Sequence, residues 1–224
     1  MKNKLNILYE DNHVIVVVKD ANVLSQGDAT GDIDLLTMVK DYIKDKYNKP
    51  GNVYVGLVHR LDRPVGGVMV FAKSSKAAAR LSDAIKKHSG FTKKYILVCE
   101  GLFKEKEGTF KDYLEKLDNG NTIVTSKDKG KESILNYKVL DENKDKNLSL
   151  VEVELITGRH HQIRVQFSSR NHTLYGDSRY GKYTKEDICL YAYKLEFIHP
   201  TLKEKMSFES KPNNNKPGFN NFIL

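Results

Sequence analysis

The feature that most constrains the fold is a succession of short strand-like runs after Gly90. Each run is rich in β-branched and aromatic residues, and clusters of Gly, Asp and Asn separate one run from the next. The runs are KKYILVCEG, TIVTS, SILNYKVLD, LSLVEVELI, LYAYKLEFI and KMSFES. Runs of this kind bounded by turn residues are typical of strands. This part of the chain therefore predicts a large, mainly antiparallel sheet.

The first ninety residues mix strand and helix patterns. The predicted strands are two within residues 5–19, around a turn, and one each at 53–58 and 66–73. A helix with apolar residues three and four apart is expected to begin near Asp32 or Asp34, either of which could be its N-cap. A second helix is expected to begin at Ser74-Ser75 and to end at Gly90. Together with the sheet, these helices predict an α+β fold.

Two segments leave alternatives open. In residues 160–170 the apolar positions fit either an alternating strand or one face of a helix. Residues 211–224 are either loose or docked only by Phe219 and Phe222. No internal repeat or linker divides the chain, so we expect one domain over residues 1–210.

Composition indicates a nucleic-acid partner and no membrane. Among 224 residues, Lys and Arg outnumber Asp and Glu by 37 to 29, giving a net charge of +8. Such an excess suits a polyanion, although solvated surface lysines would produce it as well. No run approaches the ~20 apolar residues of a membrane helix, and the N-terminus lacks the pattern of a secretory signal. Cys99 and Cys189 lack metal or redox spacing, which fits two buried side chains in a reducing cytoplasm.

A charged cluster, HRLDR at residues 59–63, stands between two apolar segments. Positive charge from Arg60 and Arg63 would favour the ionised form of Asp62, which suits a nucleophile or a general base. The alternative is a structural ion pair between Asp62 and Arg63. A proline and two glycines follow directly, so Asp62 is expected at a sharp turn between strands. Loops held by a rigid scaffold are where catalytic groups are often placed.

A second cluster, ITGRHHQIRVQ at residues 156–166, is rich in hydrogen-bond donors. Arg159 and Arg164 offer fork-shaped donors for phosphate or carboxylate. A metal site at His160-His161 is disfavoured, because adjacent residues on a helix point about 100° apart and no further ligand has suitable spacing. We therefore expect phosphate contacts, or an Arg partner for a distant carboxylate, and no metal.

Lys94-Tyr95 opens a predicted strand and forms a third candidate feature. Tyr95 is either an ordinary sheet residue or a flat face on which a base stacks. The chain has no P-loop, G-x-G-x-x-G, H-E-x-x-H or G-x-S-x-G motif, which argues against nucleotide hydrolysis, dinucleotide redox chemistry and zinc-protease chemistry.

Taken in order, these motifs resemble the RluA-type pseudouridine synthases, which isomerise uridine in ribosomal and transfer RNA. The resemblance extends from Ile7 to about Pro200 and is specific because several motifs match in sequence. The matching motifs are His59-Arg60-Leu61-Asp62-Arg63, Lys94-Tyr95 with Val98 and Gly101, Thr157-Gly158-Arg159-x-His161-Gln162-Ile163-Arg164, Gly176-Asp177-x-x-Tyr180-Gly181 and Leu195-x-Phe197-x-His199-Pro200.

The resemblance implies a site on three residues. It makes Asp62 the catalytic carboxylate, Tyr95 the aromatic that stacks on the target uracil, and Arg164 the buried cation that pairs with Asp62. Arg60 is a candidate to fill the place that a flipped-out base leaves in its stack. The other expected RNA-binding residues are Arg63, Lys94, Arg159, His161 and Gln162. The implied reaction needs neither cofactor nor metal, and attack on C1′ and abstraction of the 2′ proton both remain open.

The sequence departs from the family pattern in three places. Pro64-Val65-Gly66 stands where Thr-Ser-Gly usually follows the HRLDR signature, so hydroxyl contacts to RNA are in doubt. Lys19-Asp20-Ala21-Asn22 replaces the usual Lys-Pro-x-Gly, which suggests a reshaped loop. The short start before the first strand suggests a form without the small N-terminal RNA-binding domain of many relatives.

The sequence thus favours an RNA pseudouridine synthase, an isomerase, acting on ribosomal or transfer RNA in the cytoplasm as a monomer. The alternative is a non-catalytic RNA-binding protein that has kept the fold. Because pure binding would not require Asp62, Tyr95 and Arg164 together, their presence favours the enzyme.

Overall fold

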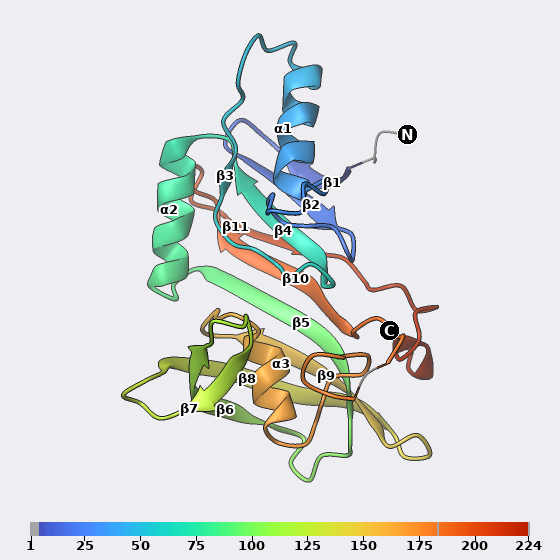
Figure 1. The fold of residues 1–224 in the computed structure, drawn as a ribbon. Helices are drawn as coiled ribbons and strands as arrows, with labels where there is room; N and C mark the ends of the chain where they lie inside the picture. Colours follow the sequence, from blue (N-terminus) through green and yellow to red (C-terminus); the bar gives the residue numbers. More distant parts are fainter. Residues whose placement is uncertain (1–4, 183, 224) are drawn as a thin grey trace. The chain divides into compact units, whose positions relative to one another are not determined.

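The computed structural model describes residues 5–182 and 184–223 and contains two compact units. Unit one comprises residues 1–91 and 194–210, and unit two comprises residues 92–193 and 211–224. The expectation of one domain over residues 1–210 stays a prediction. Figure 1 shows the elements of both units.

Unit one is built on a strand that is buried on both faces. Its elements are β1 (Asn6–Glu10), β2 (Val14–Lys19), α1 (Leu35–Lys46), β3 (Gly56–Leu57), β4 (Gly66–Ala72), α2 (Ser75–Lys86), the later half of β10 (Leu190–Ile198) and β11 (Lys205–Glu209). β2 pairs antiparallel with β1 and with β4. Val14 and Val16 pack with Ala77 and Leu81 of α2 on one face, and Ile15 on the other face is also 0% exposed. Burial on both faces explains why β2 reads as a continuous apolar run.

The helices of unit one begin where the sequence indicates. Asp34 is the N-cap of α1, its carboxylate accepting from the Thr37 N–H, and Ser74 caps α2 through the Ala77 N–H. α2 ends at Lys86, before Gly90. Two residues after the helix have a left-handed backbone conformation: His88, with φ 50°, and Gly90, with φ 66°.

A buried carboxylate fastens α1 to the sheet of unit one. Glu10 on β1 accepts hydrogen bonds from Lys46, Lys73, Tyr42 and Tyr47 at 2.6–2.9 Å. Burial would raise the pKa of Glu10, but these donors hold it at about 2. The carboxylate therefore stays ionised and keeps the last turns of α1 in place.

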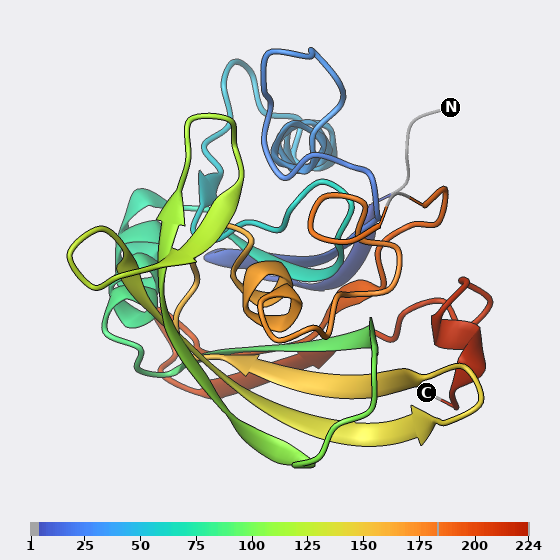
Figure 2. The same cartoon turned by 60° about the horizontal axis from the view of Figure 1, so that its bottom comes forward.

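Unit two is an antiparallel sheet with one short helix against it. Its elements are β5 (Phe91–Glu100, all but the first residue), β6 (Glu107–Lys116), β7 (Thr122–Thr125), β8 (Lys131–Asn143), β9 (Leu148–Leu155), α3 (Gln162–Ser168), the start of β10 and the 3₁₀ turn η1 (Phe219–Asn221). The strand order is β5-β9-β8-β6-β7, and every pairing along it is antiparallel. α3 lies against one face of these strands (Figure 2). The predicted α+β class and mainly antiparallel pairing are confirmed.

Three local features became clear only in the structure. Residues 160–170, which fitted a strand or a helix, contain α3. β6 was not predicted, because only Phe110 and Leu114 of its ten residues are buried and charged residues surround them. The strand expected at 53–58 is reduced to β3.

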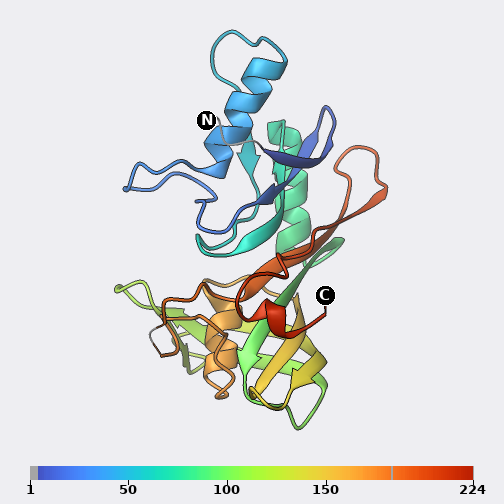
Figure 3. The same ribbon diagram turned by 90° about the vertical axis from the view of Figure 1, so that its right-hand side faces the viewer.

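The C-terminal residues dock on unit two through their two aromatic rings. Phe219 is 1% exposed and Phe222 is 8% exposed, and both pack with Ile96 and Val98 of β5 and with Leu150 of β9. Figure 3 shows this segment beside the two strands. Of the two alternatives for residues 211–224, the structure has docking by Phe219 and Phe222.

No helix among the described residues is long and apolar enough to cross a membrane.

Candidate functional site

In unit one, Asp62 lies on the loop between β3 and β4, at a turn, as the sequence predicts. Its carbonyl accepts from the Val65 N–H at 3.0 Å, which closes the turn. The buried Ser25 hydroxyl donates to the Leu61 carbonyl at 2.7 Å and accepts from the Leu61 N–H at 3.1 Å. At the start of the loop, the Val70 N–H donates to Nε2 of His59 at 3.1 Å. The residues on both sides of Asp62 are thus fixed to the scaffold, while its side chain is half-buried.

A buried lysine also holds the loop that carries Asp62. Lys19, at the end of β2, is 0% exposed. Its ammonium donates to the carbonyls of Asp20, Val23 and Arg63 at 3.0, 2.5 and 3.0 Å. Burial lowers the pKa of Lys19 to about 8, while the nearby Asp62 carboxylate works in the opposite direction. Lys19 therefore joins two loops and brings a buried positive charge near Asp62.

Lys19→Met is expected to lower the free energy of unfolding by about 1–3 kcal/mol, because the Val23 carbonyl loses the ammonium as its donor. The carbonyls of Asp20 and Arg63 keep the N–H groups of Val23 and Asn22 as donors. Urea unfolding followed by circular dichroism measures the change. Lys44→Met, at an exposed position on α1, is the control and should stay within about 0.5 kcal/mol of the wild type. A loss below 1 kcal/mol for Lys19→Met would show that the Val23 carbonyl finds another donor.

Asn22 replaces the glycine of the family pattern without changing the backbone conformation required. Its φ is 68°, in the left-handed region, which asparagine tolerates better than most residues. The Asn22 N–H donates to the Arg63 carbonyl at 2.8 Å. In the departing segment Lys19-Asp20-Ala21-Asn22, a left-handed residue therefore anchors the loop that carries Asp62.

The two arginines beside Asp62 differ in their surroundings. Arg63 pairs with Asp32 at 2.7 Å, and both side chains are about half exposed. Arg60 is exposed. Val65, in place of the usual serine, is 2% exposed and packs in the core. Arg63 thus has an ion-pair partner in Asp32, and the alternative of an Asp62–Arg63 pair stays a prediction.

In unit two, Arg164 on α3 forms a buried bidentate ion pair with Asp177. Nε and Nη2 of Arg164 donate to the two carboxylate oxygens at 2.8 and 2.6 Å. The side chains are 8% and 0% exposed. Asp177 Oδ1 also accepts from the N–H groups of Arg179 and Tyr180 at 3.0 and 3.3 Å. The guanidinium carbon lies 5.2 Å from the centroid of the Tyr180 ring.

His161 is held neutral beside this pair. Burial lowers its pKa to about 3, and the positive charge of Arg164 adds to the effect. Its Nδ1 lies 2.7 Å from the Tyr180 hydroxyl, which itself accepts from the Thr122 N–H at 2.9 Å. The Tyr180 hydroxyl thus links His161 to the Thr122 backbone through two hydrogen bonds.

Gln162 supports the turn that precedes α3. Its Oε1 accepts from the Thr157 hydroxyl at 2.9 Å and from the Arg159 N–H at 3.0 Å. Its Nε2 donates to the Ile134 carbonyl at 3.1 Å. Gln162 is 2% exposed, so its amide is occupied within unit two, whereas Arg159 is exposed. An RNA contact by Gln162 stays a prediction.

On β5, Tyr95 is 7% exposed. Lys94 points to the opposite face of the strand and pairs with Glu152 at 3.0 Å. Of the predicted catalytic residues, Asp62 belongs to unit one, and Tyr95 and Arg164 belong to unit two. The predicted pairing of Arg164 with Asp62 therefore stays a prediction.

The sequence reasoning missed the supporting residues Lys19, Ser25 and Asp177. Asp177 and Tyr180 lie in the motif Gly176-Asp177-x-x-Tyr180-Gly181, which resembles a family motif. That match could have indicated a role for Asp177 in the site. For Ser25 no local pattern exists, because its role depends on a loop that is distant in sequence.

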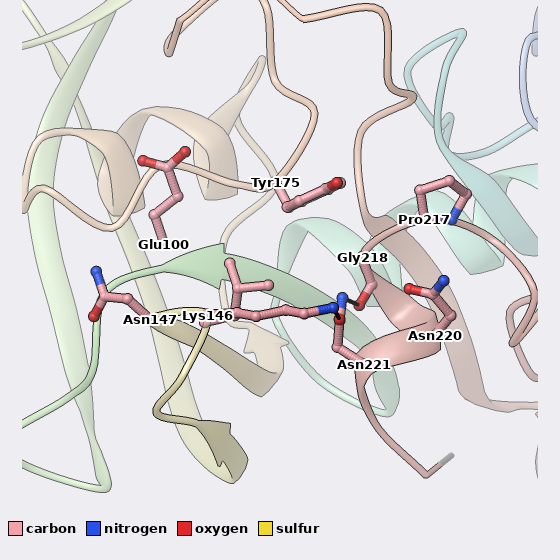
Figure 4. A pocket seen from close by; sticks show the side chains of 9 residues that line it. Glu100, Lys146, Asn147, Tyr175, Pro217, Gly218, Asn220 and Asn221 are labelled. Carbon is pink, nitrogen blue, oxygen red and sulfur yellow. Dashed lines mark hydrogen bonds between the residues drawn. The ribbon is translucent and has the colours of Figure 1, made fainter.

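A polar hollow in unit two contains none of these residues. It is lined by Lys146 and Asn147 of the β8–β9 turn, Glu100 at the end of β5, Tyr175 of the segment between α3 and β10, and Asn221 of the docked C-terminal segment. Lys146 Nζ donates to Asn221 Oδ1 at 2.5 Å across it (Figure 4). The hollow thus helps to hold the C-terminal segment. No group of three or more His, Cys, Asp or Glu side chains in the described ranges could hold a metal ion.

The chain is similar to known proteins over most of its length. Residues 13–169 match the RNA pseudouridylate synthase family. The chain is 34% identical over 210 residues to the uncharacterized RNA pseudouridine synthase YhcT of Bacillus subtilis, covering 92% of this chain and 68% of that protein. It is 30% identical over 223 residues to ribosomal large subunit pseudouridine synthase D of Zymomonas mobilis. That match covers 92% of this chain and 69% of the Zymomonas protein. The human protein RNA pseudouridylate synthase domain containing 4 has a similar fold, with a TM-score of 0.77 at 20% identity over 93% of this chain and 88% of that one.

Proposed function

Because this chain belongs to the RNA pseudouridylate synthase family, and is thus an RNA-modifying isomerase, we propose that it converts specific uridines to pseudouridine in ribosomal or transfer RNA. Asp62 acts on a nucleotide that is flipped out of its stack. The observation that carries the proposal is the Asp62 loop, whose backbone is fixed by Ser25 and Lys19 on both sides of a half-buried carboxylate. A catalytic group must be held close to its productive geometry, and such support provides it.

The reaction replaces one bond of the nucleotide by another. The C–N glycosidic bond breaks, the uracil turns, and a bond from C5 to C1′ forms. C5 loses its proton and N1 gains one, so the product is an isomer of the substrate. A positioned carboxylate assists either by attacking C1′ or by removing the 2′ proton. Both routes require the base to leave its stack, which costs a few kcal/mol. The net charge of +8 favours the RNA contacts that offset this cost.

Arg164 and Tyr95 complete the proposed site. Asp177 occupies Nε and Nη2 of Arg164, so a contact to Asp62 would use the Nη1 side of the guanidinium. Tyr95 lies against the target uracil, and the exposed Arg60 fills the place that the base leaves. Arg63 and Arg159 add positive charge for the RNA backbone, whereas Glu152 balances the charge of Lys94. The name of the Zymomonas relative supports ribosomal RNA as the first substrate to examine.

Pseudouridine mapping tests the proposal. Total RNA from the source organism, with and without the gene, is treated with carbodiimide and sequenced for reverse-transcription stops. We expect the signal to disappear at one or a few uridines and to return with the wild-type gene. An unchanged map would favour a protein that binds RNA without modifying it.

A further inference from the structure

The alternation of β5 separates two adjacent lysines. Successive side chains of a strand point to opposite faces, so Lys93 and Tyr95 share one face and Lys94 lies on the other. Lys94 lies opposite Glu154 in the register with β9. It pairs with Glu152 at 3.0 Å and lies 4.0 Å from Glu154. The charge of Lys94 is thus balanced within unit two.

Lys93 has a different environment. Burial lowers its pKa, and no carboxylate or hydrogen bond of the described residues opposes that shift. Its ammonium lies against the turn before α3, where a Cβ added at Gly158 would approach Lys93 Nζ to 2.9 Å. Gly158 thus leaves the room that the ammonium occupies. Unlike Lys94, Lys93 is a partly buried cation without an anionic partner among the described residues.

A partly buried lysine without an anionic partner lowers the stability of the fold, and binding of an anion beside it would remove that cost. Burying a charge without a partner is costly, and the protein usually neutralises the group or pairs it. An anion beside Lys93 would restore its charged form, because opposite charge favours ionisation. The substrate of an RNA-modifying enzyme carries such an anion at every nucleotide.

We propose that Lys93 binds a backbone phosphate of the RNA at or next to the nucleotide whose base contacts Tyr95. The two Cα atoms are about 6.6 Å apart along the strand, at ~3.3 Å per residue, so one nucleotide can reach both side chains. A compact ammonium suits a single phosphate oxygen. The inference rests on the proposed function, and it assigns to Lys93 an RNA contact where the sequence suggested Lys94.

Lys93→Met is the test, and Lys94→Met is its matched control, since both remove one positive charge from adjacent positions. Binding is measured by filter retention of large-subunit ribosomal RNA from a strain that lacks the gene, over a series of salt concentrations. Lys93→Met should weaken binding roughly tenfold or more and reduce the slope of log K against log salt by about 0.7–0.9, the value for one phosphate. It should raise KM with little change in kcat. Lys94→Met should stay within about twofold of the wild type.

Thermal unfolding separates this role from a structural one. Removing a buried charge that has no partner should leave the melting temperature of Lys93→Met unchanged or raise it, whereas a structural lysine would lower it. If Lys93→Met folds poorly, Lys93→Gln, of similar length and without charge, takes its place.

Several results would overturn the inference. The first is equal RNA affinity of Lys93→Met and Lys94→Met. The second is weaker RNA binding by Lys93→Met with an unchanged slope of log K against log salt. The third is a lower kcat of Lys93→Met at constant KM. A wild-type protein that binds the RNA but does not modify it would contradict only the proposed function, because the comparison of the two lysine variants would still hold.

Discussion

Asp62→Asn is expected to reduce pseudouridine formation by about a thousandfold or more while leaving RNA binding within about threefold of the wild type. Asparagine has nearly the same shape, so the loop held by Ser25 and Lys19 keeps its backbone hydrogen bonds. It lacks the negative charge that either attack on C1′ or removal of the 2′ proton requires. The loss of one general base or acid alone costs about 10²–10⁴ in rate.

Single-turnover assays on RNA from the deletion strain measure the rate, and filter binding measures the affinity. Asp32→Asn is the matched control, because it removes an exposed carboxylate that pairs with Arg63 on the same loop. Its rate should stay within about threefold of the wild type. An Asp62→Asn protein that retains a tenth of the activity would exclude Asp62 as the catalytic group, and one that no longer binds RNA would assign it to binding.

Arg164→Met is expected to lower the free energy of unfolding by about 3–5 kcal/mol. The substitution leaves Asp177, which is 0% exposed, as a buried carboxylate without its cation. Breaking a buried ion pair by removing one partner has this cost, whereas replacing both partners by apolar groups is often neutral. The double variant Arg164→Met/Asp177→Leu should therefore recover a large part of the loss, although Leu cannot accept from the Arg179 and Tyr180 N–H groups.

Urea unfolding of the two single variants and the double variant measures this coupling. The control is Arg170→Met, which breaks a similar bidentate pair with Asp112. There Arg170 is 31% exposed, so solvent screens the pair and a loss of about 1 kcal/mol is expected. Equal losses for Arg164→Met and Arg170→Met would show that burial of the Arg164–Asp177 pair has no energetic consequence.

Local patterns sufficed for most of the secondary structure. β10 has the bounds that its apolar run indicates, and Asp34 and Ser74 cap their helices because their side chains reach N–H groups only three residues away. β6 was not predicted because a strand that is exposed on much of its surface needs few apolar residues, so its sequence lacks a strand pattern. The strand is held by hydrogen bonds to its partner β8.

For the candidate site, too, some features follow from local sequence and others only from tertiary structure. The sequence alone indicates the family, the turn that carries Asp62, and the order of the motifs around Tyr95 and Arg164, because these are contiguous in the chain. Tertiary structure decided which groups support them. Lys19 meets the Arg63 carbonyl 44 positions away, and Ser25 meets Leu61 36 positions away.

Strand geometry likewise distinguishes Lys93 from Lys94, which are the same residue type but point to opposite faces of β5. The physical reason is that a hydrogen bond or an ion pair depends on distance in space. Short motifs record only distance along the chain.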